Sequence, residues 1–147
     1  MVNRFEKFSI TISEISRYWH KIASAEMEKY GLKGHYSVYF TTLYQYESGL
    51  TSVKLCELCG RDKADVSRTL SILEKKGFII KNGIKNLYRA KILLTEKGKI
   101  LAEQINLKAK SAVEYVGKDL SETSRENFYN CLEKINTNLQ RLSIVGL

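Results

Sequence analysis

Apolar side chains recur every three or four positions near both ends of the chain. The first series is Phe5, Phe8, Ile12, Ile15, Trp19 and Ile22, and the last is Phe128, Leu132, Ile135, Leu139 and Leu142. An alternation of three and four places such residues on one face of an α-helix. The pattern therefore predicts an amphipathic helix that stops at Gly31 and Gly34 and another that begins after Ser121, each with a narrow apolar stripe.

The middle of the chain predicts shorter elements separated by glycines. Thr51 and Asp62 carry side-chain oxygens that suit helix N-caps, and Gly60 and Gly77 end the helices that follow them. The predicted elements are helices over His35–Tyr46, Ser52–Cys59 and Lys63–Lys76, strands over Phe78–Lys81 and Tyr88–Leu94 around a turn at Asn82 and Gly83, and a helix capped by Thr95 that runs to about Val116. The predicted fold class is mostly α with a small β-hairpin.

The helix predicted over Lys63–Lys76 has two unlike faces. Val66, Leu70 and Leu73 are four and three residues apart, so they share one side. A rotation of about 100° per residue puts four residues on the opposite side and two at its flanks. The opposite residues are Ala64, Arg68, Ser71 and Lys75, and the flanking ones are Asp65 and Ser67.

Positive charge is concentrated in one segment. The 147 residues include 24 Lys and Arg against 16 Asp and Glu, a net charge of +8, and residues 61–99 carry +7 of it. A solvated basic face is one interpretation. Concentration into a single patterned segment instead favours a polyanionic partner such as nucleic acid.

The remaining composition bounds the class of protein. With 44% hydrophobic and 27% charged residues, the chain is typical of one globular domain. No apolar run approaches the roughly 18 residues of a membrane span, and residues 1–10 do not resemble a signal peptide. Three Cys do not indicate a disulfide framework. We therefore expect a cytoplasmic protein with no membrane partner.

The order of helices and hairpin is that of a winged helix-turn-helix. Three motifs, DKADVSRTL at 62–70, LEKKGFI at 73–79 and LTEKG at 94–98, resemble the MarR family of bacterial transcriptional regulators in their order and spacing. The resemblance covers essentially the whole chain. It implies a single domain over 1–147, in which 1–33 and 100–147 are dimerisation helices and 34–99 form the DNA-binding lobe. It also implies a nucleoid-associated regulator, expected to be a repressor, on a pseudo-palindromic operator in double-stranded DNA.

Geometry and resemblance together predict the DNA contacts. The predicted set is Ser52, Lys63, Ala64, Asp65, Ser67, Arg68, Lys85 and Arg89. Arg68 is suited to a bidentate contact with guanine, whereas Ser52 and Lys63 suit phosphate contacts. Asp65 either accepts from cytosine or favours the positive end of its helix. Arg89 matches a minor-groove arginine of the family, but Leu87 stands where the family has an Asp, which leaves the role of the wing open.

The terminal stripes predict a homodimer, because a lobe of about 65 residues would struggle to cover both of them. The predicted dimerisation residues are Phe5, Phe8, Ile12, Ile15, Leu132, Ile135, Leu139 and Leu142. The alternative is that the two helices pack on each other within one chain.

A group of aromatic and imidazole side chains suggests an effector pocket. Its predicted residues are Trp19, His20, His35, Tyr36, Tyr39 and Phe40, which suit a small aromatic effector of the kind to which relatives respond. Ordinary core packing is the alternative interpretation of each residue.

Catalytic and metal motifs are not found in the sequence. It contains no P-loop, no dinucleotide fingerprint, no nucleophile elbow and no H-E-x-x-H, so we expect no enzyme, no catalytic residue and no cofactor. Cys56 and Cys59 form a C-x-x-C, but further ligands of matching spacing do not follow, so we predict no metal and favour packing for both. A winged-helix protein-interaction subunit and a nonspecific nucleic-acid binder stay open as alternative functions.

Overall fold

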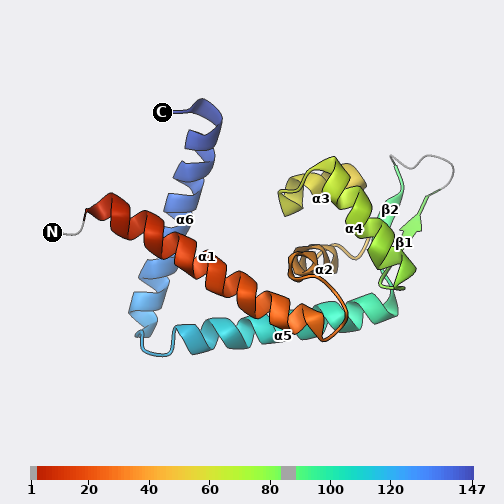
Figure 1. The fold of residues 1–147 in the computed structure, drawn as a ribbon, viewed down its shortest axis with the longest axis horizontal. Coiled ribbons are helices and arrows are strands. Elements are labelled where there is room, and N and C mark those ends of the chain that lie inside the picture. The colour runs from red at the N-terminus through yellow and green to blue at the C-terminus, as the bar shows by residue number, and fades with distance from the viewer. Residues whose placement is uncertain (1–2, 84–88) are drawn as a thin grey trace. The chain divides into compact units, whose positions relative to one another are not determined.

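The computed structural model of the chain describes residues 3–83 and 89–147 (Figure 1). Its elements are α1 (Arg4–Glu28), η1 (Gly34–Tyr36), α2 (Ser37–Tyr44), α3 (Ser52–Cys59), α4 (Lys63–Lys75), β1 (Ile79–Asn82), β2 (Lys91–Leu94), α5 (Glu96–Val116) and α6 (Glu122–Val145). The two strands pair antiparallel, so the predicted class of mostly α with a β-hairpin is confirmed. Among the described residues, no helix is both long and apolar enough to cross a membrane.

The predicted helix caps form as expected. The Thr51 hydroxyl accepts a hydrogen bond from the backbone N–H of Lys54 at 3.2 Å, and the Asp62 carboxylate accepts one from Asp65 N–H at 2.8 Å. Gly60 follows α3 with a φ of +62°, in the left-handed region where a side chain would be strained. These local interactions place the ends of α3 and α4 where the sequence predicts them.

The predicted start of the helix over His35–Tyr46 is wrong. The chain there forms a 3-10 turn, η1, before α2 begins at Ser37. The cause is a close approach to α1, because a Cβ at Gly34 would collide with the side chain and backbone of Ser24. The backbone turns tightly at this contact and opens into an α-helix only beyond it.

The hairpin strands also begin later than predicted. The N–H of Phe78 bonds to the carbonyl of Leu73 at 2.9 Å, which ends α4, so β1 starts one residue later at Ile79. β2 starts at Lys91, and Arg89 and Ala90 precede it outside the strand. The predicted strand start at Tyr88 lies outside the described residues.

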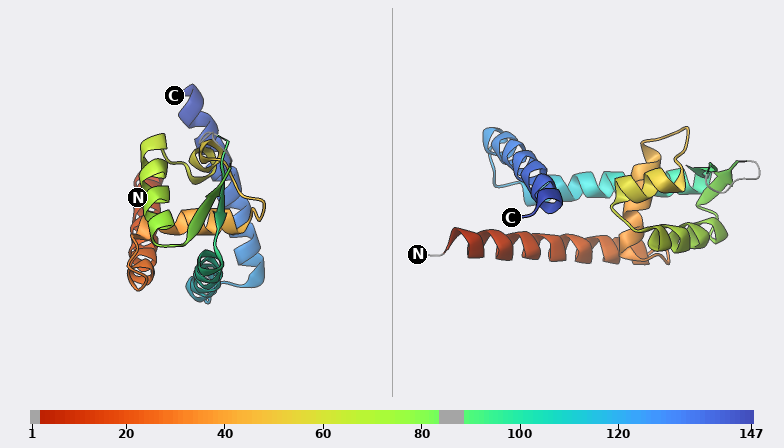
Figure 2. Two further views of the ribbon diagram at one scale, coloured as in Figure 1. Left: turned by 90° about the vertical axis from the view of Figure 1, so that its right-hand side faces the viewer. Right: turned by 90° about the horizontal axis from the view of Figure 1, so that it is seen from above.

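The chain divides into two compact units, residues 1–106 and 107–147. In the first unit, α3, α4 and the hairpin lie at one end, away from the N-terminus of α1 (Figure 2). Its core buries Val66, Leu70 and Leu73 of α4 against Phe40 and Ile92 of neighbouring elements. Since burying one such side chain fully is worth about 1.5–3 kcal/mol, the apolar side of α4 fixes which side faces outward.

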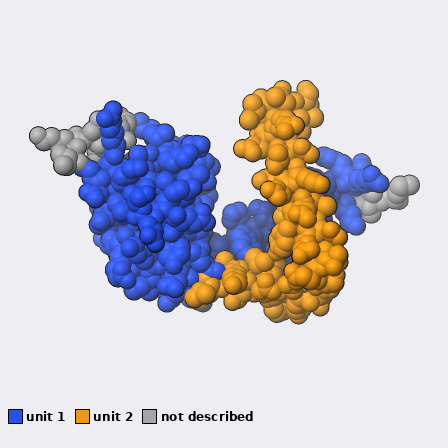
Figure 3. All heavy atoms as spheres, turned by 180° about the vertical axis from the view of Figure 1, so that it is seen from behind, with its two compact units in different colours: residues 1–106 blue, residues 107–147 orange. Residues whose placement is uncertain are grey.

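The second unit holds the end of α5, a turn and α6 (Figure 3). Arg125 fastens the turn, because its guanidinium binds Glu114 at 2.8 Å and the carbonyl of Gly117 at 3.0 Å. The Ser121 hydroxyl accepts from Ser124 N–H at 3.2 Å and caps α6. No residue of α6 is buried, although the structure describes the whole helix.

Candidate nucleic-acid interface

The outer face of α4 is polar and exposed. Lys63, Ala64, Ser67 and Arg68 are all exposed, whereas Val66 in their midst is buried. The apolar anchors beneath therefore turn these four side chains outward, as the helical period predicts. The arrangement offers one guanidinium, one ammonium and one hydroxyl from successive turns of a single helix.

Asp65 differs from the other predicted contacts of α4, because it is half-buried at the flank of the helix whereas they are exposed. Its carboxylate accepts a hydrogen bond from the Tyr39 hydroxyl at 2.9 Å and lies 3.9 Å from Nε2 of His35. Burial, with this hydrogen bond, raises the pKa of Tyr39 far above its ordinary value, so the hydroxyl stays a donor. Asp65 thus faces α2 and η1. The helical period places it at the flank of α4, and its contacts with Tyr39 and His35 turn the carboxylate toward the core.

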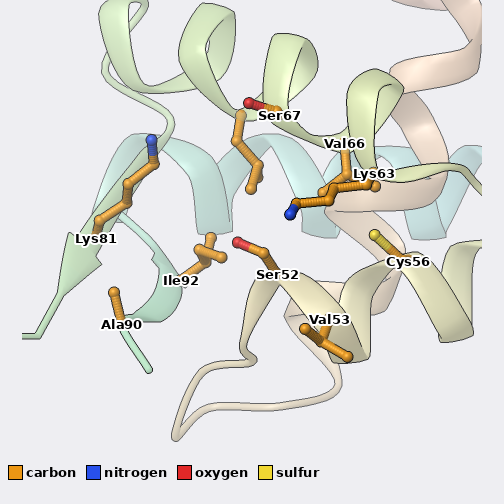
Figure 4. Close-up of a pocket in the computed structure, with 10 residues that line it drawn as sticks. Ser52, Val53, Cys56, Lys63, Val66, Ser67, Lys81, Ala90 and Ile92 are labelled. Atoms are coloured by element: carbon orange, nitrogen blue, oxygen red, sulfur yellow. The ribbon is translucent and has the colours of Figure 1, made fainter. Parts of the chain in front are cut away.

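A groove runs between α3, α4 and the hairpin (Figure 4). It has a volume of about 540 Å³, and its apolar lining includes Val66, Leu70 and Ile92. The ammonium of Lys63 reaches over it toward Ser52, the two residues predicted to hold phosphates (Figure 4). The structure thereby brings these two together from separate helices.

Sequence reasoning missed Lys81 as a groove residue. Lys81 extends from β1 into the groove lining, and its ammonium lies 3.2 Å from the Glu74 carboxylate of α4. The alternation of the strand alone could not reveal this, since the salt bridge depends on how the hairpin packs beside α4.

Of the two DNA contacts predicted in the wing, the structure describes only Arg89. Arg89 is exposed and precedes the buried Ala90. Gly83 lies opposite, where a Cβ would meet the backbone of Ala90. The predicted contact Lys85 lies outside the described residues, as does Leu87.

The six predicted effector residues do not share one pocket in the described part of the chain. Tyr36, Tyr39 and Phe40 are buried in the core, as the alternative interpretation has it, and Trp19 is exposed on α1. Only His20 and His35 line a common cavity. For these three buried rings the aromatic pattern reflects core packing, because large rings fill space between packed helices. The effector pocket itself stays a prediction.

The predicted dimerisation residues are all exposed in the single chain. Phe5 retains 71% of its surface and Leu139 47%, and the other six are exposed as well. Exposed apolar side chains at helical spacing form a contiguous stripe rather than scattered surface residues, which is typical of a face that meets a partner.

The two cysteines of the C-x-x-C motif belong to α3. Cys56 and Cys59 are half-buried, and the Cys59 thiol contacts the Thr42 hydroxyl at 3.7 Å. Burial raises the pKa of Cys59, which disfavours the reactive thiolate. No group of three or more His, Cys, Asp or Glu side chains that could hold a metal occurs among the residues described.

A basic helix braced by a shorter one, followed by a hairpin and flanked by long terminal helices, is the fold of the MarR-type transcriptional regulators. No family model matches the sequence. The transcriptional regulator SlyA superposes with a TM-score of 0.82 at 23% identity, over 94% of this chain and 98% of that one. A MarR regulator from Methanosarcina mazei Go1 gives 0.82 at 23%, over 93% and 99%.

A third solved structure was determined with DNA. This MarR family regulator from Listeria monocytogenes, in complex with a 26mer DNA, gives a TM-score of 0.79 at 23% identity, over 99% of this chain and 97% of that one. Likenesses at these identities show a shared fold. The winged helix-turn-helix predicted from the order of elements is therefore confirmed.

Proposed function

We propose that the chain is a sequence-specific regulator of transcription that binds double-stranded DNA, acts as a repressor and works as a homodimer. The observation that carries the proposal is the outer face of α4, where Lys63, Ser67 and Arg68 are exposed on a fold that a DNA-bound protein shares. A helix of this kind fits the major groove, which is wide enough to admit it. The net charge of +7 over residues 61–99 supplies attraction for phosphates.

The contacts divide by chemistry. Arg68 donates to the O6 and N7 acceptors of a guanine, and Ser67 and Ala64 meet neighbouring base edges. Ser52 and Lys63, which line the same groove, hold the phosphate backbone and set the register (Figure 4). Arg89 and Lys85 add attraction near the minor groove. Asp65, bound to Tyr39, contributes less to base readout than its neighbours.

The exposed stripes support the homodimer. In this proposal the apolar faces of α1 and α6 pair with those of a second copy, which removes them from water. A twofold dimer places its two recognition helices in successive major grooves about 34–36 Å apart. The operator is then a pseudo-palindrome. The chain reads DNA in this scheme and needs neither a cofactor nor a catalytic group.

The proposal includes release from DNA by a small effector. Effector binding stabilises a spacing of the two lobes that no longer matches the grooves. The effector should therefore weaken DNA affinity while the dimer stays intact. Sedimentation with and without effector measures the mass, and a ligand-driven monomer would contradict this mechanism.

Selection of bound duplexes from a random DNA pool tests the function. With purified protein at about physiological salt, we expect an inverted repeat with half-sites one helical turn apart. Binding with steep salt dependence but no recovered motif would instead show a nonspecific binder. If no duplex binds to folded protein from which any small molecule has been removed, the proposal is wrong, and protein docking is the alternative function to test.

A further inference from the structure

A pocket of about 350 Å³ lies between the end of α2, strand β2 and the start of α5. Its apolar base includes Leu43 and Leu94, which are buried, and Leu93, which is half-buried. The other lining residues are all exposed and combine aromatic, aliphatic and charged side chains. These are Tyr44, Tyr46, Glu47, Glu96, Lys99, Ile100 and Glu103. Every lining residue belongs to the first compact unit, and the exposed rim makes the pocket an open surface feature.

This pocket is acidic although the protein is basic. The chain carries a net charge of +8, whereas the lining has three Glu and one Lys, which is a net charge of −2. None of the ion pairs in the described part of the chain includes Glu47, Glu96 or Glu103. Glu96 lies in the first turn of α5, where it favours the positive end of the helix, but Glu47 and Glu103 lie outside any first turn. Such a surface repels phosphates and attracts cations.

Exposed rings beside these carboxylates suit a long cationic side chain. Tyr44 retains 40% of its surface and Tyr46 38%, and Ile100 retains 52%. A guanidinium or an ammonium is attracted both to the face of a phenol ring and to a carboxylate. The methylene stems of Arg and Lys also cover apolar surface, which Leu93 and Ile100 supply here. The lining therefore favours basic side chains over neutral or acidic ones.

The pocket and the groove between α3, α4 and the hairpin open on different sides of β2. Leu93 lines the pocket, and Ile92 lines the groove. These are successive residues of β2, and successive side chains of a strand point to opposite faces of the sheet. The described residues that line the two openings form separate sets with no common member. A short segment seated in the pocket therefore leaves the groove uncovered.

We propose that this pocket is a docking surface for a cationic segment of another protein, in which Arg or Lys side chains lie beside an apolar one. The basic side chains contact the carboxylates and the tyrosine rings, and the apolar side chain contacts Leu93 and Ile100. Docking goes beyond the function proposed above and does not depend on DNA binding. Where both hold, the chain joins a second protein to its site on DNA.

Binding is measured on the full chain, without DNA, by the anisotropy of labelled peptides and by NMR shifts of backbone amides. The probes are three capped peptides, Arg-Leu-Arg-Leu-Arg, Arg-Ser-Arg-Ser-Arg and Gln-Leu-Gln-Leu-Gln, at about physiological salt. We expect the first peptide to bind most tightly and to shift the amides of Tyr46, Glu47 and Ile100. Equal binding of the two Arg peptides, tightest binding of the neutral one, or shifts confined to other surfaces would overturn the proposal.

Two pairs of substitutions separate the pocket from general charge. Glu47→Gln with Glu103→Gln should weaken binding of Arg-Leu-Arg-Leu-Arg about fivefold, as expected for the loss of two exposed ion pairs. Glu57→Gln with Glu74→Gln removes the same charge from α3 and α4, outside the pocket, and should leave binding unchanged. Circular dichroism establishes that each variant is folded. An equal loss in both double variants would overturn the proposal.

Sedimentation equilibrium separates docking of another protein from contact with a second copy of this chain. Glu47→Gln with Glu103→Gln should keep the mass of the wild-type chain, because the proposed partner is a different protein. A change in mass would show that a second copy covers the pocket, and the proposal would be wrong.

Simultaneous binding is tested with the operator from selection. The affinity of Arg-Leu-Arg-Leu-Arg for the chain should be the same with and without bound DNA, since the two openings lie on different sides of β2. Competition between peptide and DNA would refute this arrangement. If the chain binds no DNA under any condition, the DNA-binding function fails, whereas the peptide titrations still decide whether the pocket is a docking surface.

Discussion

The carboxylate of Asp65 joins three elements at the start of α4. It accepts the Tyr39 hydroxyl from α2, lies beside His35 of η1 and belongs to the first turn of α4. A half-buried carboxylate with such partners stabilises one orientation of its helix, because any other orientation would leave polar groups unpaired. In the proposed DNA complex, Arg68, one turn further on, depends on that orientation to reach a guanine.

Tyr39→Phe should lower the free energy of unfolding by about 0.5–1.5 kcal/mol, since it removes the hydrogen bond to Asp65 and keeps the ring. Tyr44→Phe is the matched control, because Tyr44 is exposed. Urea unfolding measures both. A cost at Tyr39 no larger than at Tyr44 would show that the hydroxyl contributes nothing.

Arg68→Ala should weaken operator binding by about 1–3 kcal/mol and relax the preference for one base pair, as the loss of a bidentate guanine contact requires. Arg68→Lys keeps the charge but loses the planar fork, so it should retain phosphate attraction and still lose the preference. Lys118→Ala, in the turn before α6, controls for net charge. Competition binding with point-mutated duplexes gives the values. Unchanged base preference in Arg68→Ala would assign readout to another residue.

Acidification should destabilise the chain through His35. Its pKa in the folded state lies below the ordinary value of 6.5, chiefly because of burial. The unfolded chain therefore binds the proton first, and stability present above pH 6.5 is lost as the pH falls toward the lower folded-state pKa. His35→Gln should flatten this dependence. Unfolding curves between pH 7.5 and 5.5 test the sign, and greater stability at the acid end would reverse the assignment.

Element boundaries that depend on capping residues within the segment can be predicted from the sequence, whereas boundaries that depend on packing against a distant segment cannot. The bounds of α3 agree with the sequence prediction because Thr51 and Gly60 supply a cap and a stop within the segment itself. The start of α2 does not agree, since it depends on the contact of Gly34 with Ser24, ten residues earlier. The same holds for the candidate site. The helical period predicts that Arg68 faces outward, but it cannot predict that Asp65 turns inward to bind the Tyr39 hydroxyl.

Asp62→Ala should cost about 1 kcal/mol of stability, because the N–H of Asp65 loses its acceptor at the start of α4. Asp62→Asn keeps a side-chain oxygen and should cost less. Thermal unfolding of the two variants and the wild-type chain measures the loss of stability in each. If both cost the same, negative charge at the helix terminus matters rather than the cap hydrogen bond.

On the scale of the whole molecule, the terminal helices leave much apolar surface in water. Every residue of the stripes predicted on α1 and α6 for dimerisation is exposed. The sequence predicts such stripes from spacing alone, but spacing does not state what covers them. Whether the same chain or a second copy buries these stripes depends on the oligomeric state.

Ile12→Glu with Leu139→Glu should convert the proposed dimer into monomers, because burying two carboxylates per chain in an apolar interface is costly. Ile80→Glu is the control, as Ile80 is an exposed apolar residue of β1 outside both stripes. Sedimentation equilibrium gives the masses. A wild-type monomer at micromolar concentration would remove the basis of the pseudo-palindromic operator.

The contact between Gly34 and Ser24 also limits which substitutions the protein can accept at these two positions during evolution. Every single-base change that replaces this glycine adds at least a Cβ, which would meet the side chain and Cα of Ser24. A change of Ser24 to glycine removes the side-chain part of that collision. Substitutions at position 34 should therefore be tolerated more often in lineages where residue 24 has already been replaced by glycine, so the fate of a substitution at position 34 depends on which of the two mutations arises first.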